Sequence, residues 1–193
     1  MYQGKVRNMA CKTLERLVFT REDYEKENRE KLALLGNEIL SMQKDEDGLY
    51  TEEGTNQEEL LLRVLPTLTL FETELNKKEH YNDIVFQCRQ AVKKYPASVK
   101  IFSMLSGVLE TISEQIFEHY KTIQTLMWEQ YEAVKTETSD ELLCALAKGC
   151  YYKAFLLEKY EAVLDIARNN PEAFPKAYRE ILRLERRFDR RIG

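Results

Sequence analysis

The sequence predicts an all-α protein of stacked antiparallel helical hairpins, with about eight or nine helices in a single domain over residues 1–193. Three observations favour this fold class. Apolar residues recur at steps of three and four along most of the chain, which is the period of an amphipathic helix. Valine, isoleucine and threonine are scattered and do not alternate with polar residues as they do in strands. Only 7 glycines and 4 prolines interrupt the chain, and 32% of its residues are charged, as in long helices with one solvated face.

The N-terminal quarter predicts two helices and an acidic loop. Residues 5–18 carry apolar residues at roughly helical intervals, and Thr20-Arg21-Glu22-Asp23 resembles the capped start of a second helix. The apolar stripe of that second helix is Leu32, Leu35, Ile39 and Met42. Residues 44–56 are strongly acidic and contain two glycines, which predicts a solvated loop.

A leucine-rich helix is predicted at about 57–77, where Thr55 and Glu58 form a capping box at its start. Its density of leucine indicates burial on most sides, and hence a central position in the fold. Pro66 lies inside this helix and lacks the backbone N–H that a helical hydrogen bond needs. We therefore expect a kink or a break in this region.

The middle of the chain predicts three helices. The first spans 79–95 and ends before Pro96, and Ser98 is placed to cap the next one. From Ser98 the apolar pattern continues to Met127 without a proline. We divide this run into two helices near Ser113, because long helices without caps are uncommon in compact domains.

Three more helices complete the predicted fold. Ser139 is expected to cap a helix at 140–157, and a short helix follows at 160–168. Pro175 suits the first turn of the last helix, which extends to about Arg191.

Residues 68–109 resemble one tetratricopeptide-type hairpin followed by the first helix of a second one. The positions that match the first helix of the family are Leu68, Phe71 and Leu75. The positions that match its second helix in type and spacing are Tyr81, Ala91 and Pro96, and a further first helix is in register at Phe102, Leu105 and Ser106. The chain departs from the pattern where Glu72 replaces a small residue, Glu79 a turn glycine and Ile84 an alanine.

The tetratricopeptide resemblance implies an interaction scaffold. Units of this type cannot bury their own apolar faces and must stack on their neighbours, and the stack offers a groove to a protein or peptide. The resemblance also implies a more specific form of this function, the ligand-sensing part of a bacterial regulator. A bundle of helices without a repeat produces the same apolar period, so that architecture stays open as the alternative.

A second resemblance falls on overlapping residues. Asp47-Gly48-Leu49-Tyr50, Leu65-Pro66-Thr67-Leu68, Phe71-Glu72-Thr73 and residues 76–84 are similar to segments of the unsaturated glycosyluronic hydrolases. Those enzymes are (α/α)6 barrels of bacterial polysaccharide breakdown. The catalytic aspartate of that family has no counterpart here, where the chain reads Asn56-Gln57-Glu58-Glu59. The resemblance therefore implies a non-catalytic or truncated relative.

No motif of catalysis, metal binding or cofactor binding stands out in the sequence. Neither His80 nor His119 follows a carboxylate at a spacing of three, so a Glu-x-x-His di-metal motif is absent. The cysteines form no Cys-x-x-Cys pair and are expected to be buried free thiols. Residues 45–53 lack the ligand series of a calcium-binding EF-hand. We therefore assign no catalytic residue, metal or cofactor, and expect a protein that is not an enzyme.

Charge and hydropathy restrict the expected partners and location. A net charge of −4 argues against nucleic acid and against an anionic membrane surface as partners. No apolar run approaches the roughly 20 residues that cross a bilayer, and the first residues lack the apolar stretch of a signal peptide. These features predict a cytoplasmic protein.

Two groups of residues are candidates for contact with a partner. The aromatic group is Tyr120, Trp128, Tyr131 and Tyr152, which would line the groove of a curved stack and otherwise belong to the core. The basic group is Arg183, Arg186, Arg187 and Arg190 in the last helix, which would contact an acidic partner helix or the acidic loop of another subunit. Cations near a helix C-terminus also suit the helix dipole without any partner.

The leading functional hypothesis is therefore a scaffold that binds a protein or peptide. The alternatives are the hydrolase relative and a helical module for homo-oligomerisation.

Overall fold

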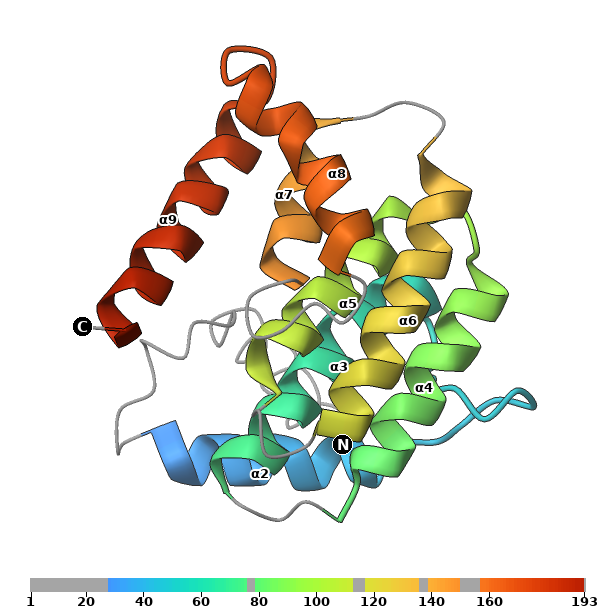
Figure 1. Ribbon diagram of the computed structural model, residues 1–193. Helices are drawn as coiled ribbons and strands as arrows, with labels where there is room; N and C mark the ends of the chain where they lie inside the picture. Colours follow the sequence, from blue (N-terminus) through green and yellow to red (C-terminus); the bar gives the residue numbers. More distant parts are fainter. Residues whose placement is uncertain (1–27, 76–78, 113–116, 136–138, 150–156, 193) are drawn as a thin grey trace.

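The computed structural model describes residues 28–75, 79–112, 117–135, 139–149 and 157–192 (Figure 1). This part of the chain contains eight helices and no strand, apart from a single antiparallel bridge between Lys44 and Tyr50, so the all-α prediction is confirmed. The predicted helix at 5–18 and the start at Thr20 lie outside the described residues. The helices are α2 (Asn28–Leu40), α3 (Gln57–Glu74), α4 (Tyr81–Lys94), α5 (Val99–Thr111), α6 (Phe117–Val134), α7 (Asp140–Gly149), α8 (Leu157–Asn169) and α9 (Pro175–Ile192).

Consecutive helices pack as hairpins, and the hairpins stack. The pairs α3–α4, α5–α6 and α7–α8 are each in contact. The first helices form one layer, because α3 packs on α5, α5 on α7 and α7 on α9. In the second layer α4 packs on α6, and Figure 1 shows these two helices side by side. Helix α2 runs crosswise at the end of this stack and packs on α3.

Helix α3 is central, as its leucine content predicts. An unbroken run of buried residues extends from Val64 to Glu72. The helix continues through Pro66, so the predicted break is absent. The hydroxyl groups of Thr67 and Thr69 donate hydrogen bonds to the carbonyl oxygens of Arg63 and Leu65 at 2.7 Å. These bonds satisfy two polar side chains that the helix carries into the core.

Two of the three predicted N-caps are confirmed. The Ser98 hydroxyl accepts the Ile101 N–H at 3.1 Å, and the Ser139 hydroxyl accepts the Leu142 N–H at 3.1 Å. The prediction for α3 is wrong by one residue, since the Asn56 side chain accepts the Glu59 N–H at 3.1 Å. Asparagine is as good an N-cap as serine, so residue preference alone does not separate neighbouring candidates.

Helix boundaries in the second half differ from prediction in one place. The long apolar run does divide into two helices, because α5 ends at Thr111 and α6 begins at Phe117. The helix predicted at 140–157 is described only to Gly149, and the next helix begins at Leu157 rather than at 160. The last helix begins at Pro175 as predicted.

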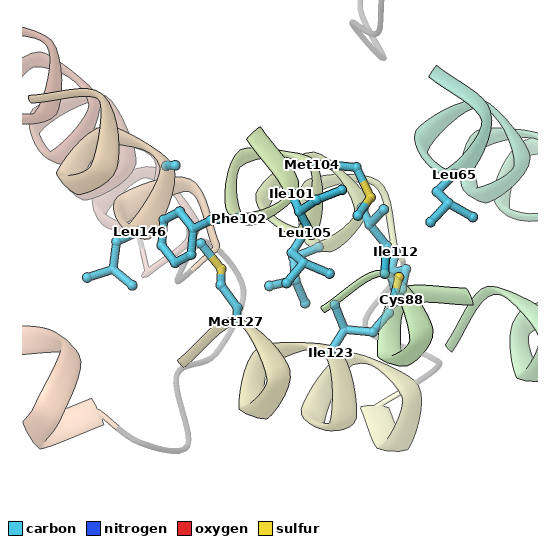
Figure 2. Close-up of a cluster of buried hydrophobic side chains, with 14 of the residues drawn as sticks. Leu65, Cys88, Ile101, Phe102, Met104, Leu105, Ile112, Ile123, Met127 and Leu146 are labelled. Atoms are coloured by element: carbon cyan, nitrogen blue, oxygen red, sulfur yellow. The ribbon is translucent and has the colours of Figure 1, made fainter. Parts of the chain in front are cut away.

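The core of the described chain is built around α5. Figure 2 shows Ile101, Phe102, Met104 and Leu105 of α5 among side chains of its neighbours, which are Leu65, Cys88, Ile123, Met127 and Leu146. These neighbours come from α3, α4, α6 and α7, so α5 holds both layers of the stack together. No helix in the described ranges is both long and apolar enough to cross a membrane.

Candidate functional site

The structure places the aromatic candidates between helices. Tyr120 and Tyr131 of α6 are buried, at 2% and 4% exposure, and Trp128 is half-buried. The Tyr120 hydroxyl donates to the Gly149 carbonyl oxygen at 2.8 Å, which ties α6 to the end of α7. The Trp128 ring lies 5.3 Å from that of Tyr131 and 5.1 Å from that of Tyr160, centroid to centroid. Tyr120 and Tyr131 are therefore core residues rather than groove lining, while Tyr152 lies outside the described residues.

The basic candidates occupy a different region of the molecule. Arg183 of α9 is about one-third exposed and pairs with Glu180 on its own helix and with Glu110 of α5, the latter at 3.2 Å. Hydrogen bonding to Glu180 raises the pKa of the Arg183 guanidinium, and burial opposes this effect. Arg186 is exposed, and positions 187 and 190 continue the same helix beyond the described side chains. The structure thus does not join the aromatic and basic candidates into one site.

A charged face extends over the first-helix layer from α5 to α9. We define it by Glu110 of α5, Asp140, Glu141 and Lys148 of α7, and Lys176, Glu180 and Arg183 of α9. Ion pairs connect these helices, because Arg183 reaches Glu110 and Lys176 reaches Glu141. Ser103 and Gly107 lie on the side of α5 that carries Glu110, because residues four and seven apart share a helix face.

Asp140 is a structural member of this face that the sequence does not reveal. Its carboxylate accepts the backbone N–H groups of Lys176 and Ala177 at 2.9 and 2.8 Å. These are N–H groups of the first turn of α9, which a helix cannot satisfy internally. Asp140 therefore caps α9 from a distance of 36 residues, and positions the basic helix against α7.

The described cysteines, Cys88 and Cys144, are free thiols. Cys88 is fully buried and Cys144 is half-buried, and both are free. Burial raises the pKa of Cys88 to about 12 and also raises the pKa of Cys144. Because the thiolate is the nucleophile, neither residue is prepared for covalent catalysis. Cys11 and Cys150 lie outside the described residues.

The two histidines lie near the N-terminus of α4 and hold its turn. The Nδ1 atom of His80 is 2.6 Å from a carboxylate oxygen of Glu72, and the His80 backbone N–H donates to the other oxygen at 3.4 Å. Glu72 is fully buried, whereas the His80 side chain is 32% exposed. The His119 ring stacks obliquely at 5.7 Å from Tyr81, and its Nε2 atom is 3.0 Å from the Asn82 side-chain oxygen. The His80 contacts therefore join the start of α4 to α3, and the His119 contacts join it to α6.

The acidic loop is bound to α4, so the prediction of a solvated loop is wrong for its centre. Leu49 and Tyr50 are buried, and the buried side chain of Gln87 donates to the Gly48 carbonyl oxygen at 2.6 Å. The Tyr50 hydroxyl donates to Asp83 at 2.7 Å, and Gly48 has a φ of 78°, a turn conformation that favours glycine. Although its glycines and acidic residues are typical of a solvated loop, this segment forms a turn that is hydrogen-bonded to α4.

Asp45 is the hub of this turn. Its carboxylate accepts the Leu49 N–H at 2.9 Å, the Gln57 side-chain amide at 2.7 Å and the Lys94 ammonium at 2.8 Å. Burial raises the pKa of the Asp45 carboxyl, but the hydrogen bonds from Lys94, Gln57 and the Leu49 backbone prevail and lower it to about 2. All of its acceptor capacity is used inside the fold. In the described residues no group of three or more acidic, histidine or cysteine side chains is arranged to hold a metal ion.

The Asp45 contacts predict a stability loss at acid pH. The pKa of Asp45 in the folded chain, about 2, is below its ordinary 3.8, so the unfolded state binds more protons between these values. The stabilisation is therefore complete above about pH 5 and disappears as the pH falls towards 2. We expect wild type to lose about 1–2 kcal/mol more than Asp45→Asn over this interval in urea unfolding. Glu46→Gln, at an exposed position of the same loop, is the control, and an equal loss in wild type and Asp45→Asn would contradict the prediction.

A shallow hollow of about 440 Å³ lies at the turn between α4 and α5. It is lined by Glu58, Ser98, Val99, Lys100 and residues 95–97. The Gln130 side chain supports this turn from below, donating to the carbonyl oxygens of Tyr95 and Ser98 at 3.0 and 3.2 Å. At this hollow the Ser98 hydroxyl donates a hydrogen bond to the Glu58 carboxylate.

Comparisons with known proteins identify no relative. No protein-family model, curated protein or solved structure matches the chain. The segments that resemble the glycosyluronic hydrolases contribute mainly to packing here, since Leu49, Tyr50, Phe71, Glu72 and residues 65–68 are all buried. Fold, charge and surface geometry therefore have to support any functional proposal.

Proposed function

We propose that this chain is a scaffold of tetratricopeptide-like hairpins that binds a protein or peptide on the charged face of α5, α7 and α9. One observation carries the proposal. The first helices of successive hairpins pack in one layer, and their outward side is polar, half-exposed and connected by the Glu110–Arg183 ion pair. Stacked hairpins use a surface of this kind for recognition, because it is extended and rigid.

Gly107 of α5 supports the proposal that a binding partner closely approaches the charged face. It lies in the interior of α5, where glycine is less favourable than alanine. A Cβ atom built on Gly107 has no heavy atom of the described chain within 4 Å, apart from its own helix backbone and neighbours. Packing within the described fold thus does not require the glycine. A partner whose backbone approaches α5 closely would require it.

Replacing Gly107 with alanine is expected to stabilise the protein by about 0.5–1 kcal/mol. The reason is that alanine restricts the unfolded chain and meets open space in the folded one. Urea unfolding followed by the fluorescence of Trp128, the one tryptophan of the sequence, measures this change. A loss of stability would show that a side chain at position 107 meets another part of the chain.

Site-specific photo-crosslinking tests the proposed binding surface. A benzoylphenylalanine replaces Ser103 on the α5 side of the face, and the matched control carries it at Glu129, which is exposed on α6 in the second layer. Both proteins are expressed in the native host and irradiated. We expect the same covalent partner to recur at position 103 and to be absent at position 129. Equal adducts at both positions, or none at 103, would refute the proposal.

A further inference from the structure

Helix α9 carries an excess of positive charge in a chain whose net charge is negative. Its cations are Lys176, Arg179, Arg183, Arg186, Arg187, Arg190 and Arg191, and its carboxylates are Glu180, Glu185 and Asp189. Seven positive and three negative charges leave this helix at +4, within a chain whose net charge is −4. The remaining residues therefore carry −8 together, so the net charge of α9 is opposite in sign to that of the rest of the chain.

The register of α9 gathers these cations on one side. At 100° per residue the seven positions fall within a sector of about 140°, and Glu180 is the one carboxylate position inside it. An adjoining side is apolar, and its residues Ala177, Ile181 and Leu184 are buried. Since α7 and α8 pack on α9, the buried side is already covered within the chain. The basic side begins beside that contact, where Lys176 reaches Glu141 of α7, and extends to the exposed Arg179 and Arg186.

Part of this basic side is without an ionic partner. Lys176 pairs with Glu141, and Arg183 pairs with Glu180 and Glu110. Arg179 and Arg186 are exposed, and neither forms an ion pair with any described residue. The Nε atom of Arg179 donates to the Pro175 carbonyl oxygen at 3.0 Å, which leaves the rest of its guanidinium group accessible. We call Arg179, Arg183 and Arg186 the arginine stripe.

The fold alone does not account for the arginine stripe. Like charges three or four residues apart on a helix cost roughly 0.2–0.5 kcal/mol per pair, and Arg179–Arg183 and Arg183–Arg186 are such pairs. Glu180 and Glu110 offset this repulsion at Arg183 but not at Arg179 and Arg186. The helix dipole favours cations within the last turn only, whereas Arg179 and Arg183 lie in the first half of α9. A partner of opposite charge would offset this repulsion.

We propose that the arginine stripe binds an acidic helical segment of a partner protein. This inference rests on the proposed scaffold function and specifies the chemistry of the partner. Carboxylates three, four and seven residues apart on a helix repeat with the same rise of about 1.5 Å per residue as the arginines. The guanidinium groups of Arg179 and Arg186 can each donate two parallel hydrogen bonds to a carboxylate, which a lysine cannot do.

The surroundings of the stripe favour a protein segment over nucleic acid. Glu180 and Glu110 lie beside Arg183, so a continuous row of phosphates would meet carboxylates at the centre of the stripe. The net charge of −4 also repels an extended polyanion at long range. An acidic helix can place carboxylates against Arg179 and Arg186 and an uncharged residue against Glu180, and because it carries fewer charges it is repelled less than a polyanion.

A labelled synthetic peptide tests this proposal. The probe is an alanine-rich helix with glutamates three, seven and ten residues after the first, and the matched control peptide has glutamine at these positions. Binding to the full chain is measured by fluorescence anisotropy at low and at physiological ionic strength. We expect the glutamate peptide alone to bind, with an affinity that falls as salt rises, because screening weakens exposed ion pairs.

Two double variants assign the binding to α9. Arg179→Gln with Arg186→Gln removes the two unpaired charges and is expected to weaken binding about tenfold. Arg89→Gln with Lys93→Gln removes the same charge from the exposed side of α4 and is expected to leave the affinity unchanged. Circular dichroism checks that both variants keep their helix content, which these exposed positions do not control.

Several outcomes would overturn the proposal. They are equal binding of the two peptides, an equal loss in both double variants, tighter binding of a duplex DNA of equal charge, and self-association that the α9 variant abolishes. The last two would assign the stripe to nucleic acid or to a second copy of the chain. If the glutamate peptide does not bind but crosslinks still form at position 103, the acidic partner is rejected and the proposed scaffold function is unaffected. Absent crosslinks with peptide binding retained would reject the scaffold function instead.

Discussion

Replacing Gly36 with alanine is expected to destabilise the protein by about 2–3 kcal/mol. Gly36 of α2 faces Phe71 of α3, and a Cβ atom added to it would lie 2.3 Å from the ring. Phe71 is fully buried within the run of buried residues of α3, so its ring cannot move aside without displacing its neighbours. The better helix propensity of alanine offsets the steric cost by only about 1 kcal/mol.

Two further glycines make this prediction specific to the contact. Gly107→Ala makes the same chemical change in open space and is expected to stabilise the protein. Gly149→Ala would meet the Met127 sulfur at 2.5 Å, and it is expected to cost less than Gly36→Ala because a methionine side chain adapts. Urea unfolding of the three variants gives the ranking. A neutral effect at Gly36 would mean that α2 does not pack on α3 as closely as the structure describes.

Replacing His80 with alanine is expected to cost about 2–4 kcal/mol. The Glu72 carboxylate is fully buried, and among the described residues His80 supplies its hydrogen-bond partners, one from the ring and one from the backbone. Without the ring, a charged group is left in the core with a single long backbone contact. Leaving a buried charge uncompensated is far more costly than removing both members of a pair.

A double-mutant cycle separates the pair from other effects of the substitution. Glu72→Leu with His80→Ala removes the charge together with its partner, and is expected to be more stable than His80→Ala alone. His119→Ala is the matched control, because that histidine contacts Asn82 and Tyr81 at the surface and faces no buried carboxylate. If His80→Ala and His119→Ala cost the same, the Glu72–His80 contact does not contribute to stability.

Local sequence patterns were sufficient to predict the positions of most of the described helices. The caps at Ser98 and Ser139 and the start at Pro175 depend on residues within one helical turn, so a reading of the chain locates them. The same applies to the division of the apolar run into α5 and α6 and to the buried leucines of α3. The N-cap of α3 was predicted at Thr55 instead of Asn56 because both neighbouring residues are good N-caps.

The candidate binding residues were predictable only in part. The basic side of α9 follows from the sequence, because seven cations at helical spacing form a pattern of their own. The aromatic residues of α6 have the same spacing whether they face a groove or the core. Tyr120 and Tyr131 are core residues because α6 packs on α5 and α4.

By itself the sequence determined that this chain is helical, where most helices begin, and which helix concentrates the positive charge. These are properties of residues close together in the chain. Only the tertiary structure decided the partners of buried and polar groups, because packing brings together residues that are distant in sequence. Asp45 meets Lys94 across 49 residues, Asp140 caps α9 across 36, and Arg183 reaches Glu110 across 73. The charged face exists because the first helices of the hairpins share one layer, and no single helix encodes it.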